Sequence, residues 1–461
     1  MAAQPMNVLE LGKTPASTVL KLSWPTILEQ IAFTVLNFAD TAMVGVLGAA
    51  CTAAVGITAP VLWLVNGIIA AVSVGFSVQV AQDVGAGDLD RASSVIRQAF
   101  VFSALSGGAL TFICFLLTPV LPALMGAEDQ VLPLAGQYFG VVCFSFFFNS
   151  LETVMAATLR CMGNTRTPMT ANIIAIVLNI FLNWLFIFPP LTVQIGGNSF
   201  TIPRAGMGPA GAALGTVLSI GAATVLILLP LLRGKSGLKL SLGGKFSFDG
   251  PVLVRAAFLG IPVALERITM SLGQVAYLRI VSTMGTTAVA AHHLAVQAES
   301  LSYLPSFGFS VAATTLVGQS VGASQPEKGL NFGRIAANMG FACMSVTGVL
   351  LFVLAAPIIS IFTRDAAVIA LGASLLRVVA FAQPGEAWAN IYTGALRGAG
   401  DSRWPFYINL VGVWGIRVLL AVIFVFGFGL GLQWVWVAMF ADLTFRGIVC
   451  RRRFLRQNWY H

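Results

Sequence analysis

The sequence predicts an all-α integral membrane protein: twelve transmembrane helices in two six-helix lobes, related by a parallel internal repeat. Three observations lead to this fold. The composition is strongly apolar, the second half of the chain repeats the first, and long apolar stretches follow one another along the chain.

The composition comes first because it decides the class of protein. Of 461 residues, 57% are hydrophobic and 9% are charged, and the mean hydropathy is +0.88. A soluble domain would carry roughly a quarter charged residues, so most of this chain must face lipid or other apolar helices. The 47 glycines suit membrane helices that pack closely through small residues.

The second half of the chain repeats the first at a constant offset of 237 residues. Pro25 and Glu29 recur as Pro262 and Glu266. The other residues of the first half that recur at this offset are Ser73, Val74, Gln82, Gly85, Ala86, Leu159, Arg160, Gly163, Arg166, Pro168 and Asn172. In a chain this apolar, such duplication is typical of a transporter built from two related bundles, with the substrate handled between them.

Apolar stretches long enough to cross a bilayer predict the helices in order. We expect spans at 17–47, 51–82, 92–117, 131–158, 168–189, 210–232, 254–284, 287–320, 330–357, 368–396, 405–428 and 432–450. Six helices per repeat, an even number, give both lobes the same orientation, which makes the repeat parallel. The predicted domains are an N-terminal cytoplasmic segment 1–16, an N-lobe 17–232, a basic linker 233–253, a C-lobe 254–450 and a basic cytoplasmic tail 451–461.

The basic residues predict which side of the membrane each loop occupies. Twenty of the 26 lysines and arginines fall on one side, whereas the opposite loops hold only Arg204 and Arg364. The positive-inside rule then places both termini and the central linker in the cytoplasm, as in a multi-pass protein of the inner membrane. The four remaining arginines, Arg267, Arg279, Arg377 and Arg417, fall inside predicted spans.

Several other classes of function lack support in the sequence. The net charge of +9 does not indicate nucleic-acid binding, because the basic residues sit in short loops between apolar stretches. The six cysteines are scattered without CxxC spacing, which predicts neither a disulfide nor a metal site. No Walker motif is present, so we expect an ion gradient rather than ATP to supply the energy. We expect no cofactor and no enzymatic activity.

Three motifs, at 40–45 (DTAMVG), 82–88 (QDVGAGD) and 396–403 (LRGAGDSR), resemble those of the multidrug and toxic compound extrusion (MATE) family. The resemblance covers about residues 15–450 and is closest to bacterial members, of the DinF-like or a related branch. It implies twelve helices in two lobes that open alternately. It also implies export of organic cations and drugs in exchange for protons or sodium ions.

Asp40 is the strongest candidate for ion coupling, because ionisable groups inside a span are costly and usually functional. No arginine or lysine falls in the middle of an N-lobe span, and the repeat equivalent of Asp40 is Tyr277. Amides are expected around it: Asn37 lies one turn earlier, and Asn179 and Asn183 lie one turn apart on one face of the fifth span. Burial disfavours a bare carboxylate, so we expect Asp40 to take up a proton or a sodium ion.

Three C-lobe acids are further candidates for coupling or substrate binding: Glu266, Glu299 and Glu386. They share their lobe with four arginines inside spans, so some are expected to be neutralised in ion pairs. We rank Glu299 highest, because it lies mid-span and could also hold a sodium ion. Glu266 repeats Glu29 near the cytoplasmic end, which favours a structural role.

Two aromatic and histidine motifs favour structural roles. We expect Trp434 and Trp436 to anchor the chain at the membrane interface. The pair His292 and His293 has no cysteine or acid nearby and does not predict a metal site.

These observations together predict a secondary antiporter that works as a monomer in the lipid bilayer. It would export amphiphilic organic cations in exchange for H+ or Na+ by alternating access. A flippase for lipid-linked or other amphiphiles, of the same superfamily, is the alternative. A membrane receptor or enzyme would need a polar catalytic cluster or a soluble domain, and neither is visible in the sequence.

Overall fold

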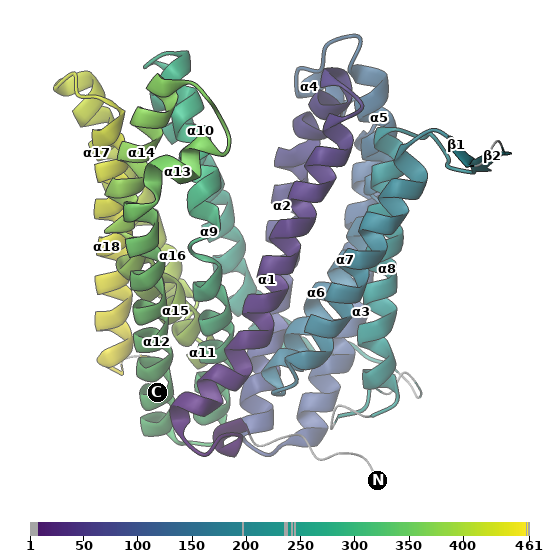
Figure 1. The fold of residues 1–461 in the computed structure, drawn as a ribbon. Helices are drawn as coiled ribbons and strands as arrows, with labels where there is room; N and C mark the ends of the chain where they lie inside the picture. The colour runs from purple at the N-terminus through teal and green to yellow at the C-terminus, as the bar shows by residue number, and fades with distance from the viewer. Residues whose placement is uncertain are drawn as a thin grey trace.

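The computed structural model describes residues 8–195, 198–234, 238–240, 243, 246–457 and 459. The chain is helical apart from one short hairpin in this described part. Its helices form two groups, an N-terminal group α1–α8 and a C-terminal group α9–α18. The groups lie side by side where the two termini are and diverge toward the opposite end (Figure 1). The predicted basic linker lies between the two groups in the sequence, and its Lys235 and Lys245 lie outside the described residues.

The N-terminal group follows a short 3-10 helix, η1 (Val8–Glu10). Its helices are α1 (Pro15–Gly45), α2 (Ala49–Gly85), α3 (Leu89–Leu117), α4 (Leu121–Leu124), α5 (Leu132–Val142), α6 (Ser145–Cys161), α7 (Arg166–Ile187) and α8 (Pro209–Leu232). Between α7 and α8, strand β1 (Leu191–Ile195) pairs antiparallel with β2 (Asn198–Ile202), with Leu191 opposite Ile202.

The C-terminal group repeats this order with more breaks. Its helices are α9 (Gly250–Ser282), α10 (Thr286–Ser300), α11 (Leu304–Gly322), α12 (Pro326–Val353), α13 (Ala355–Ser360), α14 (Ala366–Ala380), α15 (Gln383–Ala399), α16 (Arg403–Leu410), η2 (Val411–Val418), α17 (Leu419–Val422), η3 (Ile423–Gly427) and α18 (Leu432–Leu455). The segments η2 and η3 are π-helical, and they continue the course of α16 and α17 without an intervening turn.

Side-chain caps fix where several of these helices begin. Thr14 forms a capping box with Ser17 at the start of α1, and the carboxylate of Asp88 accepts from the backbone N–H of Arg91 at the start of α3. Asp249 and Asp365 cap α9 and α14 in the same way. Each cap satisfies backbone donors that a helix start leaves without partners, so these boundaries follow directly from the sequence.

Each predicted span coincides with a helix or with a run of consecutive helices. Among the described residues, seven helices are long and apolar enough to cross a membrane, or nine if each of two bent pairs is one span. The bent pairs are α5–α6, with an angle of 43°, and α14–α15, with an angle of 53°. The structure therefore shows a multi-pass helical membrane protein.

Reciprocal hydrogen bonds join the two groups at the end that holds the termini. Nε2 of Gln82 donates to the carbonyl of Gly398 at 3.0 Å, and Nε2 of Gln319 donates to the carbonyl of Cys161 at 2.8 Å. Gln319 and Gly398 each lie 237 residues after their N-terminal counterparts. The two bonds thus exchange equivalent groups, as an approximate two-fold relation between the halves requires.

Glycine makes this close approach possible. A Cβ atom on Gly322 would collide with the backbone carbonyl of Gln82, and one on Gly85 would collide with that of Gln319. Gly75 and Gly260 do the same further along α2 and α9, where a Cβ would lie 2.6 Å and 2.7 Å from backbone oxygens of the other group. Small residues here let helix backbones touch, as is usual between membrane helices.

The expectation for Trp436 is wrong. Its side chain is fully buried in the core of the C-terminal group, and its indole N–H donates to Nδ1 of His292 at 3.2 Å. A buried indole is stable when its N–H finds an acceptor, which His292 provides. Trp434, by contrast, is exposed on the same helix.

Candidate functional site

Asp40 lies half-buried in the second half of α1, which packs against α7. The amide Nδ2 of Asn183 donates to its Oδ1 at 2.7 Å. The side-chain amide of Asn179 is oriented so that its nitrogen lies 3.1 Å from the same oxygen of Asp40. Its oxygen then accepts from the hydroxyl of Ser219 at 3.2 Å. The structure therefore brings together Asp40, Asn179 and Asn183, three of the residues that the sequence singled out.

Close packing of α7 and α8 supports this cluster from behind. A Cβ on Gly215 of α8 would collide with Oδ1 of Asn183, so glycine leaves room for the amide. The same Oδ1 is buried and accepts no hydrogen bond from any described residue. The two amides therefore present N–H donors to the carboxylate, and their oxygens face α8.

No lysine, arginine or histidine forms an ion pair with Asp40 in the described part of the chain. Asn37 does not join the cluster: it is exposed on α1, where its backbone carbonyl accepts from the hydroxyl of Thr41. At the equivalent place in the other half, the hydroxyl of Tyr277 donates to the carbonyl of Val435 at 2.7 Å. The carboxylate of Asp40 is thus specific to the N-terminal group.

Glu299 and Glu386 each lie beside a break between two helices of the C-terminal group. Glu299 lies in the last turn of α10 and Glu386 in the first turn of α15. Three residues from each acid along the chain, the hydroxyl of Ser302 donates to Oε1 of Gln383 at 2.8 Å and joins the two breaks. Oε2 of Glu386 is buried and has no hydrogen-bond partner among the described residues. Glu299 therefore lies at a break in its span.

A chain of alternating charges runs beside this acid pair. Its central acid is Asp442 on α18, whose Oδ2 accepts from Nε of Arg417 at 2.9 Å and from Nη2 of Arg446 at 3.0 Å. Nη1 of Arg446 also donates to Oδ1 of Asn409 at 2.7 Å. Among the described residues, Arg417 is therefore the one of the four arginines predicted inside spans that forms an ion pair. The C-terminal group balances this buried acid with buried bases.

Two matching ion pairs lie nearer the end that holds the termini. Nη2 of Arg160 donates to Glu29 at 2.6 Å, and Nη2 of Arg397, its repeat counterpart, donates to Glu266 at 2.7 Å. Both acids and both bases are largely buried. Glu266 is therefore held in a buried ion pair by a base that the sequence analysis did not assign to it.

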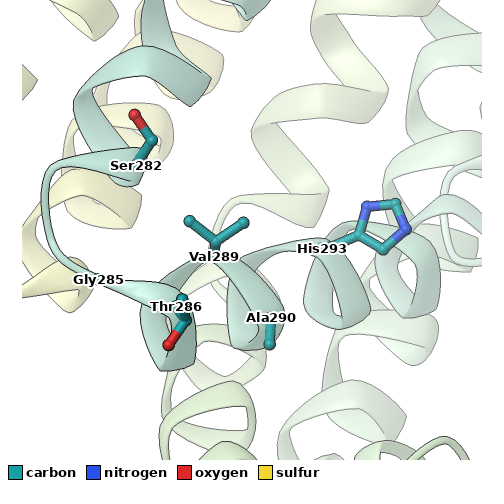
Figure 2. Close-up of a pocket in the computed structure, with 6 residues that line it drawn as sticks. All are labelled: Ser282, Gly285, Thr286, Val289, Ala290 and His293. Carbon is teal, nitrogen blue, oxygen red and sulfur yellow. The ribbon is translucent and has the colours of Figure 1, made fainter. Parts of the chain in front are cut away.

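A pocket of about 460 Å³ opens at the turn between α9 and α10. Figure 2 shows its lining, with the ring of His293 projecting from α10 and the hydroxyl of Ser282 coming from the end of α9. None of the candidate carboxylates lines it. His292, next to His293, is buried between Tyr277 and Trp436, in keeping with a structural role.

The family model MatE matches the chain twice, over residues 25–185 and 262–423. The chain belongs to the MATE family. The two matches begin at the same offset of 237 residues that relates the halves of the sequence, so the family unit is the repeat itself. The resemblance seen in the sequence motifs is thereby confirmed.

Curated relatives of this MATE protein include two bacterial chains of similar length. It is 30% identical over 444 residues to the "Probable multidrug resistance protein NorM" of Thermotoga maritima, covering 96% of this chain and 92% of that one. It is 26% identical to the "Uncharacterized transporter YisQ" of Bacillus subtilis, covering 97% and 96%.

Solved MATE structures share the fold. One described as the "Outward-facing conformation of a multidrug resistance MATE family transporter of the MOP superfamily" superimposes with a TM-score of 0.90 at 24% identity, covering 99% of this chain and all of that one. A MOP superfamily transporter from Pyrococcus furiosus, described as having a binding pocket of reverse polarity, gives a TM-score of 0.90 at 23% identity, with the same coverage. These likenesses establish the arrangement of the helices.

Metal binding through several acidic, cysteine or histidine ligands finds no support in the described residues, where no group of three or more such side chains could hold an ion. A monovalent ion needs less, because amide and backbone oxygens can complete its shell around one carboxylate. The carboxylate of Asp40 can itself take up a proton, whereas sodium binding would require the amides of Asn183 and Asn179, whose nitrogens face Asp40, to turn their oxygens toward it.

Proposed function

We propose that this MATE protein exports organic cations or amphiphilic drugs in exchange for H+ or Na+. The observation that carries the proposal is Asp40, a carboxylate in a membrane helix that is hydrogen-bonded to amides and has no basic partner among the described residues. A charge in such surroundings needs a counter-ion, and a proton, a sodium ion and a cationic substrate all qualify. The names of the multidrug resistance relatives support the choice of substrate.

The proposed architecture gives this site its two-sided access. We infer twelve spans in two six-helix lobes, N-lobe 17–232 and C-lobe 254–450, corresponding to the two helix groups of Figure 1. Both termini and the linker 233–253 would face the cytoplasm of a cell whose inner membrane holds the protein as a monomer in lipid. The divergent end would then face outward.

Competition for Asp40 provides a simple coupling mechanism. When Asp40 is ionised, it attracts the cationic substrate; when a proton or sodium ion binds, that attraction is lost and the substrate can leave outward. Asn183 and Asn179 hold the ionised carboxylate by donating to it, and an amide that turned over would accept from the protonated form. Pro25 lies inside α1, and this residue gives the helix a point at which to bend as its packing changes.

Glu299 and Glu386 form the proposed second acidic site, in the C-lobe. Their position at two helix breaks lets a small change in bend angle alter the distance between the acids. We assign them to substrate attraction or to a second ion, and we assign Glu266 to the structure of its lobe because Arg397 neutralises it.

The deciding experiment is transport of ethidium into or out of reconstituted vesicles, driven separately by a proton gradient and by a sodium gradient. We expect one of these gradients to drive accumulation against the ethidium gradient, and an ionophore that collapses it to abolish that accumulation. Ethidium movement that only dissipates its own gradient, under both conditions, would rule out coupled antiport.

A further inference from the structure

The buried ion pair of the N-terminal group contains an acid that its C-terminal counterpart lacks. Nδ2 of Asn172 donates to Oε1 of Glu29 at 2.7 Å and to Oε1 of Glu152 at 3.1 Å. Two carboxylates therefore approach the same amide nitrogen, and Arg160 is the guanidinium that pairs with this cluster. The repeat position of Glu152 is Ala389.

The two copies of the ion pair also use their acids differently. Glu266 accepts through both oxygens, Oε2 from Arg397 at 2.7 Å and Oε1 from Asn409 at 2.9 Å. In the N-terminal copy, Arg160 and Asn172 both reach Oε1 of Glu29, at 2.6 Å and 2.7 Å. Oε2 of Glu29 is left buried with no hydrogen-bond partner among the described residues, and the residue is only 6% exposed.

The net charge of the two clusters also differs. Glu29, Glu152 and Arg160 sum to one negative charge, whereas Glu266 and Arg397 cancel. In the C-terminal copy, Oδ1 of Asn409 accepts from a second base, Arg446, which shares Asp442 with Arg417. An unpaired charge in low dielectric is unstable without a counter-ion, so the N-terminal cluster calls for one more positive charge.

A polar path leads from the cluster toward the other helix group. The hydroxyl of Thr153 lies 3.1 Å from Oε2 of Glu152 and 3.2 Å from Oδ1 of Asn149, and Asn149 donates to Asn66 at 2.7 Å. Asn66 is exposed, and its neighbour Gly67 faces Arg267 of α9 across the junction of the groups. Hydroxyl and amide groups therefore connect Glu152 to the space between the groups, and they offer an ion a route to it.

We propose that Glu29 and Glu152 form a second monovalent-cation site, for H+ or Na+, so that two cations enter for each substrate exported. The inference rests on the proposed antiport, and it specifies how many cations are exchanged for each substrate molecule. The site is separate from Asp40, which lies eleven residues beyond Glu29 on α1, about 16 Å along a helix. The charged and polar groups around it are Arg160, Asn172 and Thr153.

The net charge moved per cycle tests this directly. Exchange of one ethidium cation for two monovalent cations carries one positive charge inward, whereas one-for-one exchange carries none. In proteoliposomes with equal pH and equal Na+ on both sides, a potassium diffusion potential should drive ethidium transport by the wild type. Separate arms, with and without Na+, identify the ion, and protein-free vesicles measure leak.

We expect Glu152→Gln and Glu152→Ala to lose this response to voltage while retaining transport driven by a chemical gradient of the ion. The alanine variant reproduces the arrangement at Ala389, so it tests the same point if glutamine perturbs folding. Glu128→Gln, at an exposed acid in a loop, is the matched control and should keep the voltage response.

Two results would overturn the second site. One is an unchanged voltage response in folded Glu152 variants, and the other is a wild type that couples to an ion gradient yet shows no response to voltage. A wild type that couples to neither ion gradient would instead refute the antiport proposal, so the two failures are distinguishable.

Discussion

Equivalent residues in the two halves differ most where the chemistry is proposed to occur. Asp40 and Tyr277 occupy the same place in the repeat, yet one is a carboxylate held by amides and the other a phenol bonded to a carbonyl. The ion pairs of Glu29 and Glu266, by contrast, recur almost unchanged. A residue that a single half carries, such as Asp40 or Glu152, points to a task of that half.

Replacing Asp40 by asparagine removes the titrating group and keeps its shape. We expect the Asp40→Asn protein to fold and insert normally, because an amide can still bond with Asn183, with a change in stability within about 1 kcal/mol. Weak ethidium binding should persist, whereas ion-driven efflux should fall to background. Efflux and binding at equal protein levels check this, with Glu128→Gln as the control; wild-type efflux would move the coupling site to Glu299 or Glu386.

Glu299 and Glu266 should respond differently to the same substitution. Glu266→Gln leaves Arg397 buried without its partner, which costs roughly 3 kcal/mol or more of stability, whereas Glu299 has no such ion pair among the described residues. We therefore expect Glu266→Gln to lower the melting temperature and the yield, and Glu299→Gln to lower transport per folded molecule. Thermal unfolding and efflux at matched amounts of folded protein measure the two effects. Normal transport by Glu299→Gln beside inactive, well-folded Glu266→Gln would reverse our ranking.

The sequence could predict part of the candidate site. Asn179 and Asn183 are one helical turn apart, so their common face was predictable, and the isolation of Asp40 from basic residues was visible in the spans. The cluster of Glu152 with Asn172 was missed, although Asn172 recurs at the repeat offset. Recurrence identifies residues that matter but does not say which of them touch, because contacts between α1, α6 and α7 depend on how the helices pack.

At the scale of helices, the boundaries were more predictable than the breaks. Apolar length and capping residues locate the spans, since Asp88, Asp249 and Asp365 mark helix starts by their chemistry. The bend of 53° between α14 and α15 was not predicted. Helix breaks in a membrane are permitted where neighbouring groups satisfy the freed backbone, which is a property of the packed structure rather than of the local sequence.

The reciprocal glutamine bonds should hold the end with the termini closed. Each hydrogen bond contributes about 1 kcal/mol, and Gln82 also accepts from Arg255 of the other group. Gln82→Ala with Gln319→Ala should therefore shift the balance toward opening at that end by about 30-fold or more. Labelling by a maleimide checks this in single-cysteine proteins. Cys161, which is buried beside the Gln319 bond, should become more reactive.

Cys114 provides the control for that measurement, because it is buried in a different core cluster within the N-terminal group. Its reactivity should not change in the double variant. Equal reactivity of Cys161 with and without the two glutamines would show that other contacts keep this end closed.

At the scale of the molecule, duplication explains both the fold and its asymmetry. The family model matches each half separately, and the halves meet through bonds that exchange equivalent residues. The sequence predicted this because the offset is constant. It could not predict how far the groups diverge, since that depends on which of several packings of the same two units is adopted.

The distribution of basic residues gives the molecule its predicted orientation. In the predicted topology, twenty lysines and arginines fall on the side of the termini against two on the other, and such a bias determines the orientation of membrane helices during insertion. A cysteine placed at Arg364 should therefore react with an impermeant maleimide in intact cells, and one placed at Ser236 in the linker should not. Both should react once the cells are permeabilised, which controls for burial. In the predicted parallel arrangement both halves share one orientation, so labelling of Ser236→Cys from outside would reverse the whole topology and place the divergent end in the cytoplasm.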